Sequence, residues 1–414
     1  MLNKNNEREL AYVVTVDVIT PIEGYDRVEL AHVGGWTIVV GKGEFHAGDP
    51  AIYFEIDSKL PEVEPFINME FLAKKKYKIK TQKMCKSISQ GLLMSAANFG
   101  WTIGRDTQDS SGDVYFIVDD KGEHHYSGGE SRFLTKQLGV TYAVAEDNTR
   151  KANSVDKYKK MAQRNGKLFS HQPFKWLMKR TWGKKLLFVF FGRKRDKKSG
   201  WPAWVVKTDE ERIQNMPWIL KDKEPWIATE KIDGTSTTFT MKRGKWPHKD
   251  EFYVCSRNVV FDKPDKACFY DTNVYTEMAE KYDIYNKMKD LLYNYFTDCE
   301  WITIQGETYG PGIQKRDYHA PEHAFMAFNF ITSKEGRWGT ENMVELLEKH
   351  MGIPCVPVLD KNYILPDTVE ELLDFATGES VCDYDLREGI VFRSKDGKKS
   401  FKAVSNEYLI AYHS

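Results

Sequence analysis

The sequence has no hydrophobic run that could span a membrane. Its longest apolar stretch covers only residues 186–191, and a membrane helix needs about 20 such residues. The first ten residues, MLNKNNEREL, contain no apolar signal region. The cysteines are few, far apart and form no CxxC pair, which argues against a zinc site or a disulfide framework. We therefore expect an intracellular protein with reduced thiols and no membrane partner.

The sequence also lacks a net charge, because 60 Lys and Arg balance 60 Asp and Glu. This balance hides a local asymmetry. Residues 145–200 contain 17 Lys and Arg against 4 Asp and Glu, and they include the amphipathic piece PFKWLMKRTW. Such a segment fits a basic insertion that grips nucleic acid, and it fits a linker between domains equally well.

The length of 414 residues predicts two or three domains. Between residues 10 and 135, short runs of Val, Ile and Tyr alternate with turns at Gly24, Gly34 and Gly48, which predicts a small β-barrel. Residues 74–86 of this part carry seven lysines and no acidic residue. These lysines are suited to follow a phosphate backbone, or they keep an exposed sheet edge soluble.

From residue 204 the pattern becomes mixed α and β. The segments PWIATEK, EFYVCSRN, WITIQGETYG, HAFMAFNFI and REGIVFRSK predict strands. Two segments with apolar residues at intervals of three and four, NVYTEMAEKYDIYNKMKDLLYNY and GTENMVELLEKHMG, predict amphipathic helices.

The most informative stretch is residues 228–239, ATEKIDGTSTTF, in which Lys231 stands two residues before Asp233. A lysine must be neutral to act as a nucleophile, and its usual pKa is about 10.4. The adjacent carboxylate alone would hold the proton on the amine. A lysine that attacks a nucleotide phosphate should therefore be accompanied by carboxylates that bind a divalent metal and by further cations.

The downstream sequence supplies both kinds of group. CSRN places Arg257 at a strand edge, QGETYGPGIQK places Glu307 beside a glycine-rich turn, and REGIVFR places Glu388 at the start of a strand. SFKAVS adds Lys402 on a final strand, and FMAFNF is an aromatic strand that contains Phe328. Each piece is common alone, but the ordered set is hard to obtain by chance.

This ordered set resembles the motifs of the covalent-lysine nucleotidyltransferase superfamily, which contains RNA ligases, ATP-dependent DNA ligases and mRNA capping enzymes. KIDG resembles motif I, SRN motif Ia, GETYGPG motif III, FMAFNF motif IIIa, EGIVFR motif IV and SFK motif V. The resemblance implies that Lys231 takes AMP from ATP and that Glu230 reads the adenine amino group. It implies these further ATP-binding residues: Arg212, Arg257, Glu307, Phe328, Glu388 and Lys402. It also implies that Asp233, Glu307 and Glu388 hold Mg²⁺ or Mn²⁺.

Within the superfamily, the sequence is similar to the Deinococcus and Naegleria type of nick-sealing RNA ligase, which has an OB domain before the nucleotidyltransferase domain. The chain ends at residue 414, so we expect no barrel after motif V. We expect an α+β protein with an OB-fold-like domain at 1–140, a basic insertion or linker at 141–203 and a nucleotidyltransferase domain of antiparallel sheets with flanking helices at 204–414.

The function that the resemblance implies is ATP-dependent sealing of nicks between a 3′-hydroxyl and a 5′-phosphate, with nicked duplex RNA or an RNA-containing duplex as partner. The alternatives are an ATP-dependent DNA ligase, a capping-type guanylyltransferase and an inactive nucleic-acid-binding protein. Two positions depart from the family pattern. Ser400 stands where a first motif V lysine is often found, with Lys399 as its possible substitute, and Asn329 stands where motif IIIa often has Asp.

Overall fold

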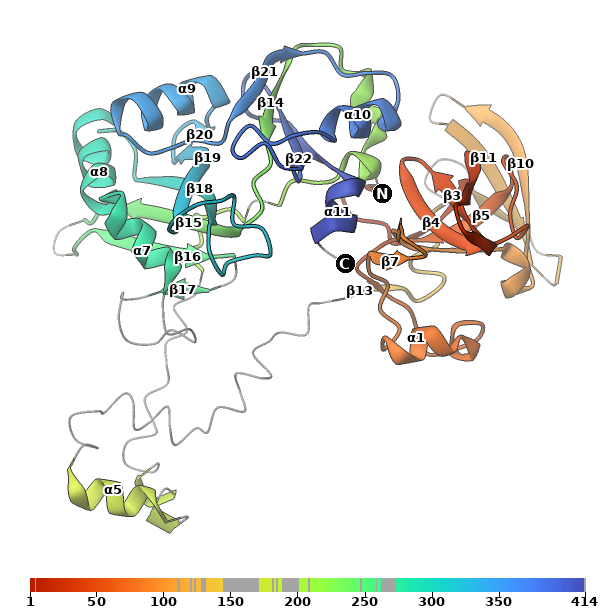
Figure 1. The fold of residues 1–414 in the computed structure, drawn as a ribbon, viewed down its shortest axis with the longest axis horizontal. Helices are drawn as coiled ribbons and strands as arrows, with labels where there is room; N and C mark the ends of the chain where they lie inside the picture. Colours follow the sequence, from red (N-terminus) through yellow and green to blue (C-terminus); the bar gives the residue numbers. More distant parts are fainter. Residues whose placement is uncertain are drawn as a thin grey trace. The chain divides into compact units, whose positions relative to one another are not determined.

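The computed structural model describes residues 1–3, 5–109, 112–119, 121–122, 124–127, 132–143, 171–180, 182–183, 185–187, 201–207, 209–245, 248–257, 259–261 and 273–412. The chain divides into two compact units (Figure 1). The first contains Met1–Val144, Asp209–Ile232 and Pro357–Ser414, and the second contains Ala145–Thr208 and Asp233–Val356. The boundary between them falls inside the KIDG sequence, between Ile232 and Asp233.

The N-terminal part of the first unit is built from short antiparallel strands. Three of its sheets have the orders β1-β5-β9, β2-β3-β4 and β10-β11-β12, and two are strand pairs, β7-β8 and β13-β6. Their bounds are β1 Ala11–Thr15, β2 Val18–Ile22, β3 Tyr25–Val33, β4 Trp36–Gly41, β5 Pro50–Phe54, β6 Ser58–Lys59, β7 Gln82–Met84, β8 Ser87–Ser89, β9 Leu92–Met94, β10 Thr102–Asp109, β11 Gly112–Val118, β12 His124–Ser127 and β13 Thr141–Tyr142. Short helices lie between them: η1 Phe66–Asn68, α1 Glu70–Lys74 and η2 Ala96–Phe99.

The β1–β5 pair is buried on both of its faces. Successive side chains of a strand point to opposite sides, and on β1 this sends Val13 into one apolar cluster and Tyr12 into another. On β5, Phe54 joins the first cluster and Tyr53 the second. Two cores that share a central pair of strands explain why these segments are continuously apolar.

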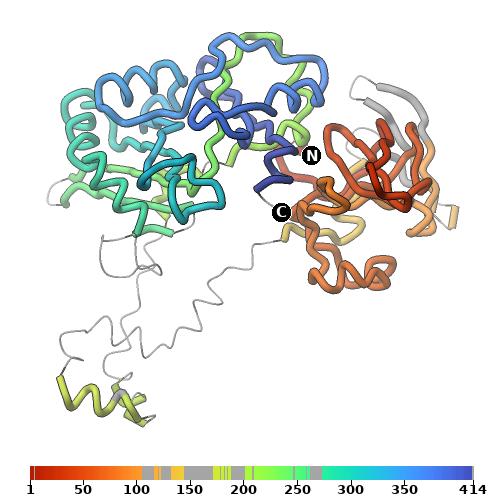
Figure 2. Tube along the Cα trace, in the orientation of Figure 1, coloured from red at the N-terminus to blue at the C-terminus, as the bar shows by residue number. Residues whose placement is uncertain are grey.

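The remainder of the first unit is a four-stranded sheet with the order β21-β14-β22-β23. Its elements are β14 Trp226–Glu230, β21 Val358–Tyr363, β22 Gly389–Ser394, β23 Ser400–Val404, α10 Val369–Ala376, α11 Asn406–Tyr412, η4 Ile213–Asn215 and η5 Pro217–Lys221. β14 comes from the middle of the chain and pairs with the late strands β21 and β22, as the green and blue segments of Figure 2 show. Trp226, Phe392 and Phe401 lie in its core.

The N-terminal sheets, which are called the barrel below, are joined to this four-stranded sheet within the first unit by specific contacts. The Gln214 side-chain amide donates to the Gly35 carbonyl at 3.4 Å, and the Leu2 amide donates to the Asn215 carbonyl at 2.9 Å. Ile88 of β8 packs against Val404. The segment around η4 is therefore held against the barrel by hydrogen bonds, just after Arg212.

The second unit contains a six-stranded antiparallel sheet with the order β17-β16-β15-β18-β19-β20. The strands are β15 Thr235–Lys242, β16 Glu251–Ser256, β17 Val260–Phe261, β18 Trp301–Tyr309, β19 Ala324–Thr332 and β20 Gly336–Arg337. Its helical elements are α5 Gln172–Met178, α7 Val274–Lys281, α8 Ile284–Asp290, η6 Leu291–Tyr295, α9 Thr340–Val344 and η7 Glu345–His350. Apolar side chains from α7 to η7 pack on one face of the sheet, against Phe239, Ile304 and Phe325.

The long helix expected over residues 273–295 is divided in two. α7 starts after Asn273, whose side chain accepts hydrogen bonds from the Tyr275 and Thr276 amides. The chain then turns at Asp283, which has a left-handed φ of 49°, and α8 begins at the next residue. The apolar periodicity continues through this turn, so the sequence pattern alone could not reveal the break.

The α+β fold with an N-terminal OB-fold domain is confirmed by the comparisons given below. Most of the basic segment at 145–200 lies outside the described residues, apart from α5 and its immediate neighbours. Among the described residues, no helix has the length and apolar character required to cross a membrane. None of the five cysteines in the described part of the chain forms a disulfide.

Candidate active site

Lys231 lies directly after β14 in the first unit and forms an ion pair with Glu388. Its Nζ is 2.7 Å from Oε2 of Glu388, and the two side chains are 25% and 10% exposed. The Lys231 amide also donates to the Gly389 carbonyl at 3.0 Å. Gly389 has a φ of +156°, and a Cβ there would lie 2.2 Å from the Ala403 carbonyl oxygen. Because it has no side chain, Gly389 allows β22 to approach β23 closely. Its carbonyl then accepts the hydrogen bond that holds the backbone of Lys231.

Two further cations, Lys402 and Arg212, lie near this pair in the same unit. Lys402 stands on β23 opposite Val391, and its amide donates to the Glu211 carbonyl at 2.7 Å. This bond and a parallel bridge place Arg212 beside Lys402. Burial, followed by the charges of Lys231 and Arg212, lowers the pKa of Lys402 to about 8. A bound anion would relieve the mutual repulsion of these cations. Nη1 of Arg212 is buried with no hydrogen-bond partner, so it has a donor to offer to such an anion.

Glu230 is the last residue of β14 and is 1% exposed. Both oxygens of its carboxylate accept hydrogen bonds from the loop between α10 and β22. The Ser380 hydroxyl donates to Oε1 at 2.5 Å, and the Val381 amide donates to Oε2 at 2.9 Å. Arg387 ties the same loop to the end of α10 by donating to the Ala376 carbonyl at 3.0 Å. A carboxylate has about four lone-pair sites, so Glu230 is fixed in place and retains capacity to accept from a ligand.

Asp233 and Gly234 belong to the second unit, where the loop after β18 holds them. The Asp233 amide donates to the Tyr318 hydroxyl at 2.7 Å, and the Gln314 side chain donates to the Gly234 carbonyl at 2.9 Å. A Cβ at Gly234 would lie 2.3 Å from the Thr308 carbonyl oxygen. Glycine is therefore required at this position because the chain passes so close to β18.

Glu307 and Phe328 lie on the second-unit sheet at the end where β15 begins. Glu307 stands opposite Ser236 and is half-buried, whereas the neighbouring Gly306 lies against the core residue Phe325. Glu307 thus points to the face opposite the apolar core. The register of β18 and β19 shifts at Phe328, which is a bulge residue and lies outside the buried core cluster. Bulges commonly re-aim a side chain in this way.

Arg257 follows β16 directly and is exposed. Ser256, the last residue of that strand, stands opposite Thr237, near the start of β15. Hence Asp233, Arg257, Glu307 and Phe328 all come from the same end of the second-unit sheet.

The predicted residues are thus distributed between the two units. The first unit brings together Glu230, Lys231, Glu388, Lys402 and Arg212. The second contains the other four predicted residues. In the described part of the chain, no three His, Cys, Asp or Glu side chains converge as a ready metal site.

The two departures from the family pattern have local explanations. Lys399 is paired with Asp222, at 2.7 Å between Nζ and Oδ2, and its side chain is 61% exposed. It directly precedes β23 and lies three positions before Lys402, an odd spacing that directs the two side chains to opposite faces of an extended chain. Asn329 is buried, and its amide donates to Gln305 at 3.2 Å. A neutral amide therefore completes a hydrogen-bonded polar pair at this position.

Ser380 and Tyr318 are contact residues that sequence reasoning missed. Both lie in irregular loops, between α10 and β22 and between β18 and β19. Neither loop has a periodic pattern, and each residue reaches its partner across a long sequence separation, from Ser380 to Glu230 and from Tyr318 to Asp233. No local signal in the sequence marks them.

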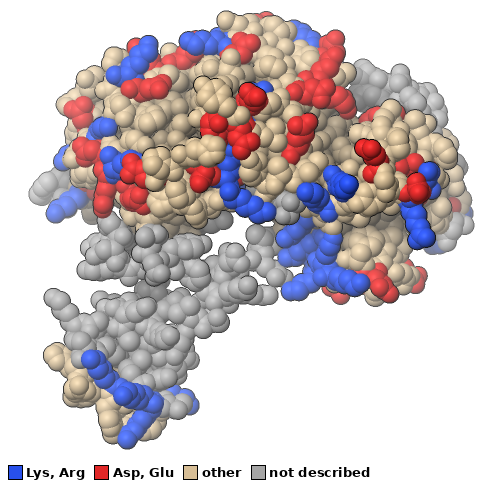
Figure 3. All heavy atoms as spheres, in the orientation of Figure 1, with Lys and Arg blue, Asp and Glu red and all other residues tan. Residues whose placement is uncertain are grey.

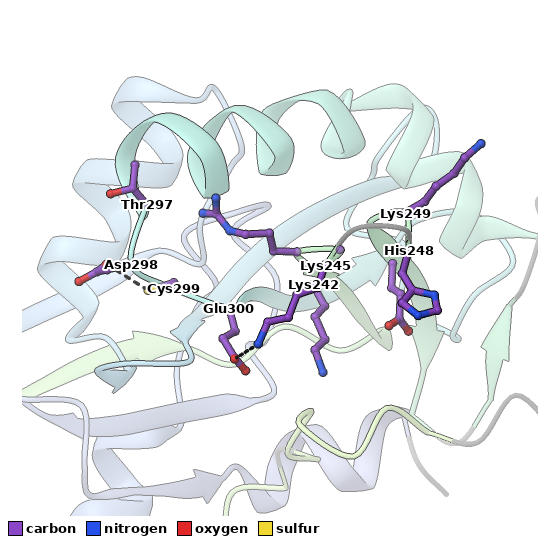
Figure 4. A pocket seen from close by; sticks show the side chains of 11 residues that line it. Lys242, Lys245, His248, Lys249, Thr297, Asp298, Cys299 and Glu300 are labelled. Carbon is purple, nitrogen blue, oxygen red and sulfur yellow. Dashed lines mark hydrogen bonds and ion pairs between the residues drawn. The ribbon is translucent and has the colours of Figure 1, made fainter.

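A pocket of about 420 Å³ lies at the opposite end of β15, around Lys242 (Figure 4). The Arg243 side chain caps the C-terminal end of η6 there, since its Nη2 donates to the Leu292 and Phe296 carbonyls. Lys245 reaches Glu300 at 3.4 Å, as the figure shows. The lining residues include four Lys or Arg and three Asp or Glu: Lys242, Arg243, Lys245, Lys249, Glu251, Asp298 and Glu300. Because these charges nearly balance, we assign no ligand to this pocket.

Comparison with known proteins identifies both parts of the chain. Residues 224–404 match the model of the RNA ligase family, and residues 10–96 match that of an OB-fold domain. The chain is similar to the solved structure of Naegleria gruberi RNA ligase with PPi, at 25% identity and a TM-score of 0.60, over 98% of this chain and 99% of that chain.

Two mutants of the same Naegleria gruberi enzyme give similar results. A mutant with AMP and Mn has 25% identity and a TM-score of 0.62, over 98% of this chain and 99% of that chain. A mutant with ATP and Mn has 25% identity and a TM-score of 0.61 over the same shares. Among curated proteins, none matches the chain. Residues 224–404 are therefore an RNA ligase domain that follows an OB-fold domain, and nearly the whole chain is similar in structure to Naegleria gruberi RNA ligase.

Proposed function

We propose that this RNA ligase uses ATP to seal a 3′-hydroxyl to a 5′-phosphate, through a lysyl-AMP and an RNA-adenylate. The observation that carries the proposal is the cluster of Lys231, Glu388, Lys402 and Arg212 in the first unit. One amine is partly exposed and two cations lie close to it, as required for attack on a phosphate. The solved relatives with ATP, AMP and PPi support the choice of nucleotide.

Lys231 is the proposed nucleophile. In the first step its Nζ loses a proton and bonds to the α-phosphorus, while the bond to the β-phosphate oxygen breaks and pyrophosphate leaves. The attack requires a neutral amine, whereas Lys231 forms an ion pair with Glu388 in the structure. Lys402 and Arg212 offset the negative charge on the phosphates, and such positioning and charge stabilisation carry most phosphoryl-transfer catalysis.

The second and third steps act on RNA. A 5′-phosphate oxygen attacks the lysyl-AMP phosphorus, the P–N bond breaks and Lys231 regains its proton. The 3′-oxygen then attacks the 5′-phosphorus of the RNA-adenylate, and AMP leaves with the electrons of the broken P–O bond. Because both RNA ends and the nucleotide must be aligned, accurate positioning supplies much of the rate.

We assign the remaining predicted residues as follows. Glu230 accepts from the adenine amino group and Phe328 lies on the adenine face. Arg257 contacts the phosphates or the ribose, and Glu307 contacts the ribose. Asp233, Glu307 and Glu388 are the carboxylates that would hold Mg²⁺ or Mn²⁺. Carboxylates are suitable ligands, and Mg²⁺ needs only one or two of them because it retains water and binds substrate phosphates. When bound, the metal supplies positive charge to the phosphates.

The barrel is the proposed RNA-binding domain. Lys74, Lys75 and Lys76 around the end of α1, and Lys83 and Lys86 around the β7–β8 pair, are exposed. Figure 3 shows a gathering of Lys and Arg over this part of the first unit. Such a surface matches the backbone of a nicked duplex RNA or an RNA-containing duplex. We also propose the division into an OB-fold-like domain at 1–140, a basic insertion at 141–203 and a nucleotidyltransferase domain at 204–414.

The proposal is tested by incubating the protein with a divalent metal and α-labelled ATP or, in parallel, α-labelled GTP. We expect label on the protein with ATP, which survives a denaturing gel because the P–N bond is covalent. Addition of a nicked RNA duplex should then discharge the label and yield a sealed strand. No label with ATP would overturn the proposal, and label with GTP alone would indicate a capping-type enzyme.

A second prediction concerns Ser380, which holds the carboxylate of Glu230. The Ser380→Ala variant should lower the preference for ATP over GTP about tenfold, because a hydrogen bond to a charged group contributes about 1.5–3 kcal/mol and the freed carboxylate can rotate. The measurement is the rate of labelling with each nucleotide. Ser380→Thr should restore the preference.

Thr377→Ala is the matched control, because the Thr377 hydroxyl lies in the same loop but donates to Leu373 and Ser405. It should leave the ratio of the two rates unchanged. An equal fall of both rates in Ser380→Ala would show that Ser380 only supports the loop and does not affect recognition of the base.

A further inference from the structure

The basic segment contains one described piece, helix α5 and the residues just after it, that lies outside both matched family ranges. In α5 and the two residues that follow it, the exposed residues other than Pro173 recur at intervals of three and four: Gln172, Lys175, Trp176, Lys179 and Arg180. Residues with this spacing share one face of a helix. The exposed surface of α5 and of the two residues after it therefore carries three cations around a tryptophan.

The apolar residues of α5 point elsewhere. Phe174 and Leu177 are half-buried, and Leu187, which follows in the sequence, is 4% exposed. A helix that lies in a membrane surface presents its apolar face outward and immerses it in lipid. In α5 the exposed Trp176 instead stands among the cations Lys175, Lys179 and Arg180, while Phe174 and Leu177 are half-buried. This mixed surface favours a polyanion as the partner over a lipid surface.

The tryptophan on the basic face belongs to an aromatic and cationic cluster. The Arg180 guanidinium lies 3.6 Å from the centre of the Trp176 ring, and Trp182 contacts the same ring edge-on at 6.1 Å. Trp176 is 50% exposed and Trp182 is 55% exposed. Exposed tryptophan and arginine planes provide a stacking surface for unpaired bases, and nearby lysines attract the phosphates between those bases.

We propose that the face of α5 formed by Lys175, Trp176, Lys179 and Arg180, together with Trp182, binds single-stranded RNA. Figure 3 shows this helix with its Lys and Arg side chains at the surface. The inference rests on the proposed function only for its choice of RNA as the polyanion. Its role in the reaction is to hold a single-stranded extension of the nicked duplex while the nucleotidyltransferase residues act on the ends.

The test uses the full-length chain and a labelled single-stranded RNA oligonucleotide, with binding followed by anisotropy at several salt concentrations. The Trp176→Ala/Trp182→Ala variant should weaken binding about five- to hundredfold, as expected for the loss of base stacking. Trp176→Phe should bind better than Trp176→Ala, because it retains an aromatic plane.

A second variant, Lys175→Ala/Lys179→Ala/Arg180→Ala, should lower the slope of log K against log salt by about 2, since each neutralised phosphate contributes about 0.7. Its charge-matched control is Lys245→Ala/Lys249→Ala/Lys289→Ala, which removes three exposed lysines of the second unit. The control should leave the slope unchanged. Formation of labelled lysyl-AMP from ATP requires no RNA and should be equal in all variants.

RNA binding and salt slopes equal to those of the unaltered protein in both α5 variants would overturn the inference. Binding to anionic lipid vesicles that is lost in the tryptophan variant, with RNA binding unchanged, would also overturn it and would identify α5 as a membrane contact. Absence of lysyl-AMP in the unaltered protein counts against the proposed ligase chemistry. The RNA-binding measurement does not depend on lysyl-AMP formation and therefore tests the α5 inference separately.

Discussion

Replacement of Lys231 by alanine is expected to abolish labelling of the protein by α-labelled ATP. Lys231 Nζ is the atom proposed to bond to the phosphorus, so its removal eliminates the first covalent step. Neither Lys402 nor Arg212 can substitute for it, because both are required to stabilise the phosphate that is attacked. The measurement is the labelled band on a denaturing gel after incubation with ATP and metal.

Lys231→Arg is a sharper form of the same test. A guanidinium retains the positive charge next to Glu388, whose Oε2 lies 2.7 Å from Lys231 Nζ in the unaltered protein. This variant should therefore fold and still show no label, because arginine remains protonated and cannot act as a nucleophile.

Lys399→Ala is the control for loss of a lysine in the same unit. Lys399 is exposed and paired with Asp222, so its removal should not reduce labelling. Persistence of the label in Lys231→Ala would refute the assignment of the nucleophile, and mass spectrometry of the labelled peptide would locate the residue that replaces it.

The KIDG and EGIVFR segments show what local sequence can predict. Lys231 and Glu388 are separated by 157 positions, yet each adjoins a recognisable apolar strand, since Lys231 follows β14 and Glu388 precedes β22. Their types match the chemistry of phosphate transfer. β14 and β22 form because these residues are apolar and β-branched, and their pairing places Glu388 next to Lys231. The sequence could therefore predict the charged groups of the first unit and their order.

Other features depend on contacts that a single strand does not encode. The bulge that re-aims Phe328 arises from the register between β18 and β19, and the neighbouring Phe325 and Phe330 have the same residue type but lie in the core. Ser380 lies in an irregular loop, where only tertiary contact with Glu230 reveals its position. The division of the chain inside KIDG likewise arises from long-range packing.

The second large effect is expected at Lys402. Lys402→Ala should slow lysyl-AMP formation on the order of 10²- to 10³-fold, the loss typical when one group that stabilises a developing oxyanion is removed. Lys402 lies beside Arg212 and is close enough to Lys231 for that charge to lower its pKa. Its ammonium is thus placed to stabilise the phosphate that Lys231 attacks. Lys399→Ala again provides the control, because that side chain lies on the opposite face.

The pH dependence distinguishes this role from a structural one. Burial and the two neighbouring cations lower the pKa of Lys402 to about 8, so the free protein loses this positive charge as the pH rises above 8. At ATP concentrations well below saturation, the rate reports the ionisation of the free protein. Loss of the Lys402 charge by itself should lower the rate about tenfold per pH unit above that point, measured relative to a variant in which this charge does not titrate. Deprotonation of Lys231 has the opposite sign, because it creates the nucleophile and raises the rate.

Lys402→Arg should therefore remove the alkaline decrease, even if its absolute rate is lower, since a guanidinium stays charged throughout this range. Lys402→Ala should show no decrease there either, because the titrating cation is absent. An alkaline decrease near pH 8 that persists in both variants would have to come from another group, and it would show that Lys402 does not supply the charge. A decrease that disappears in both variants, with the rate restored only in part by arginine, identifies Lys402 as a cation that contacts the phosphate in a geometry specific to lysine.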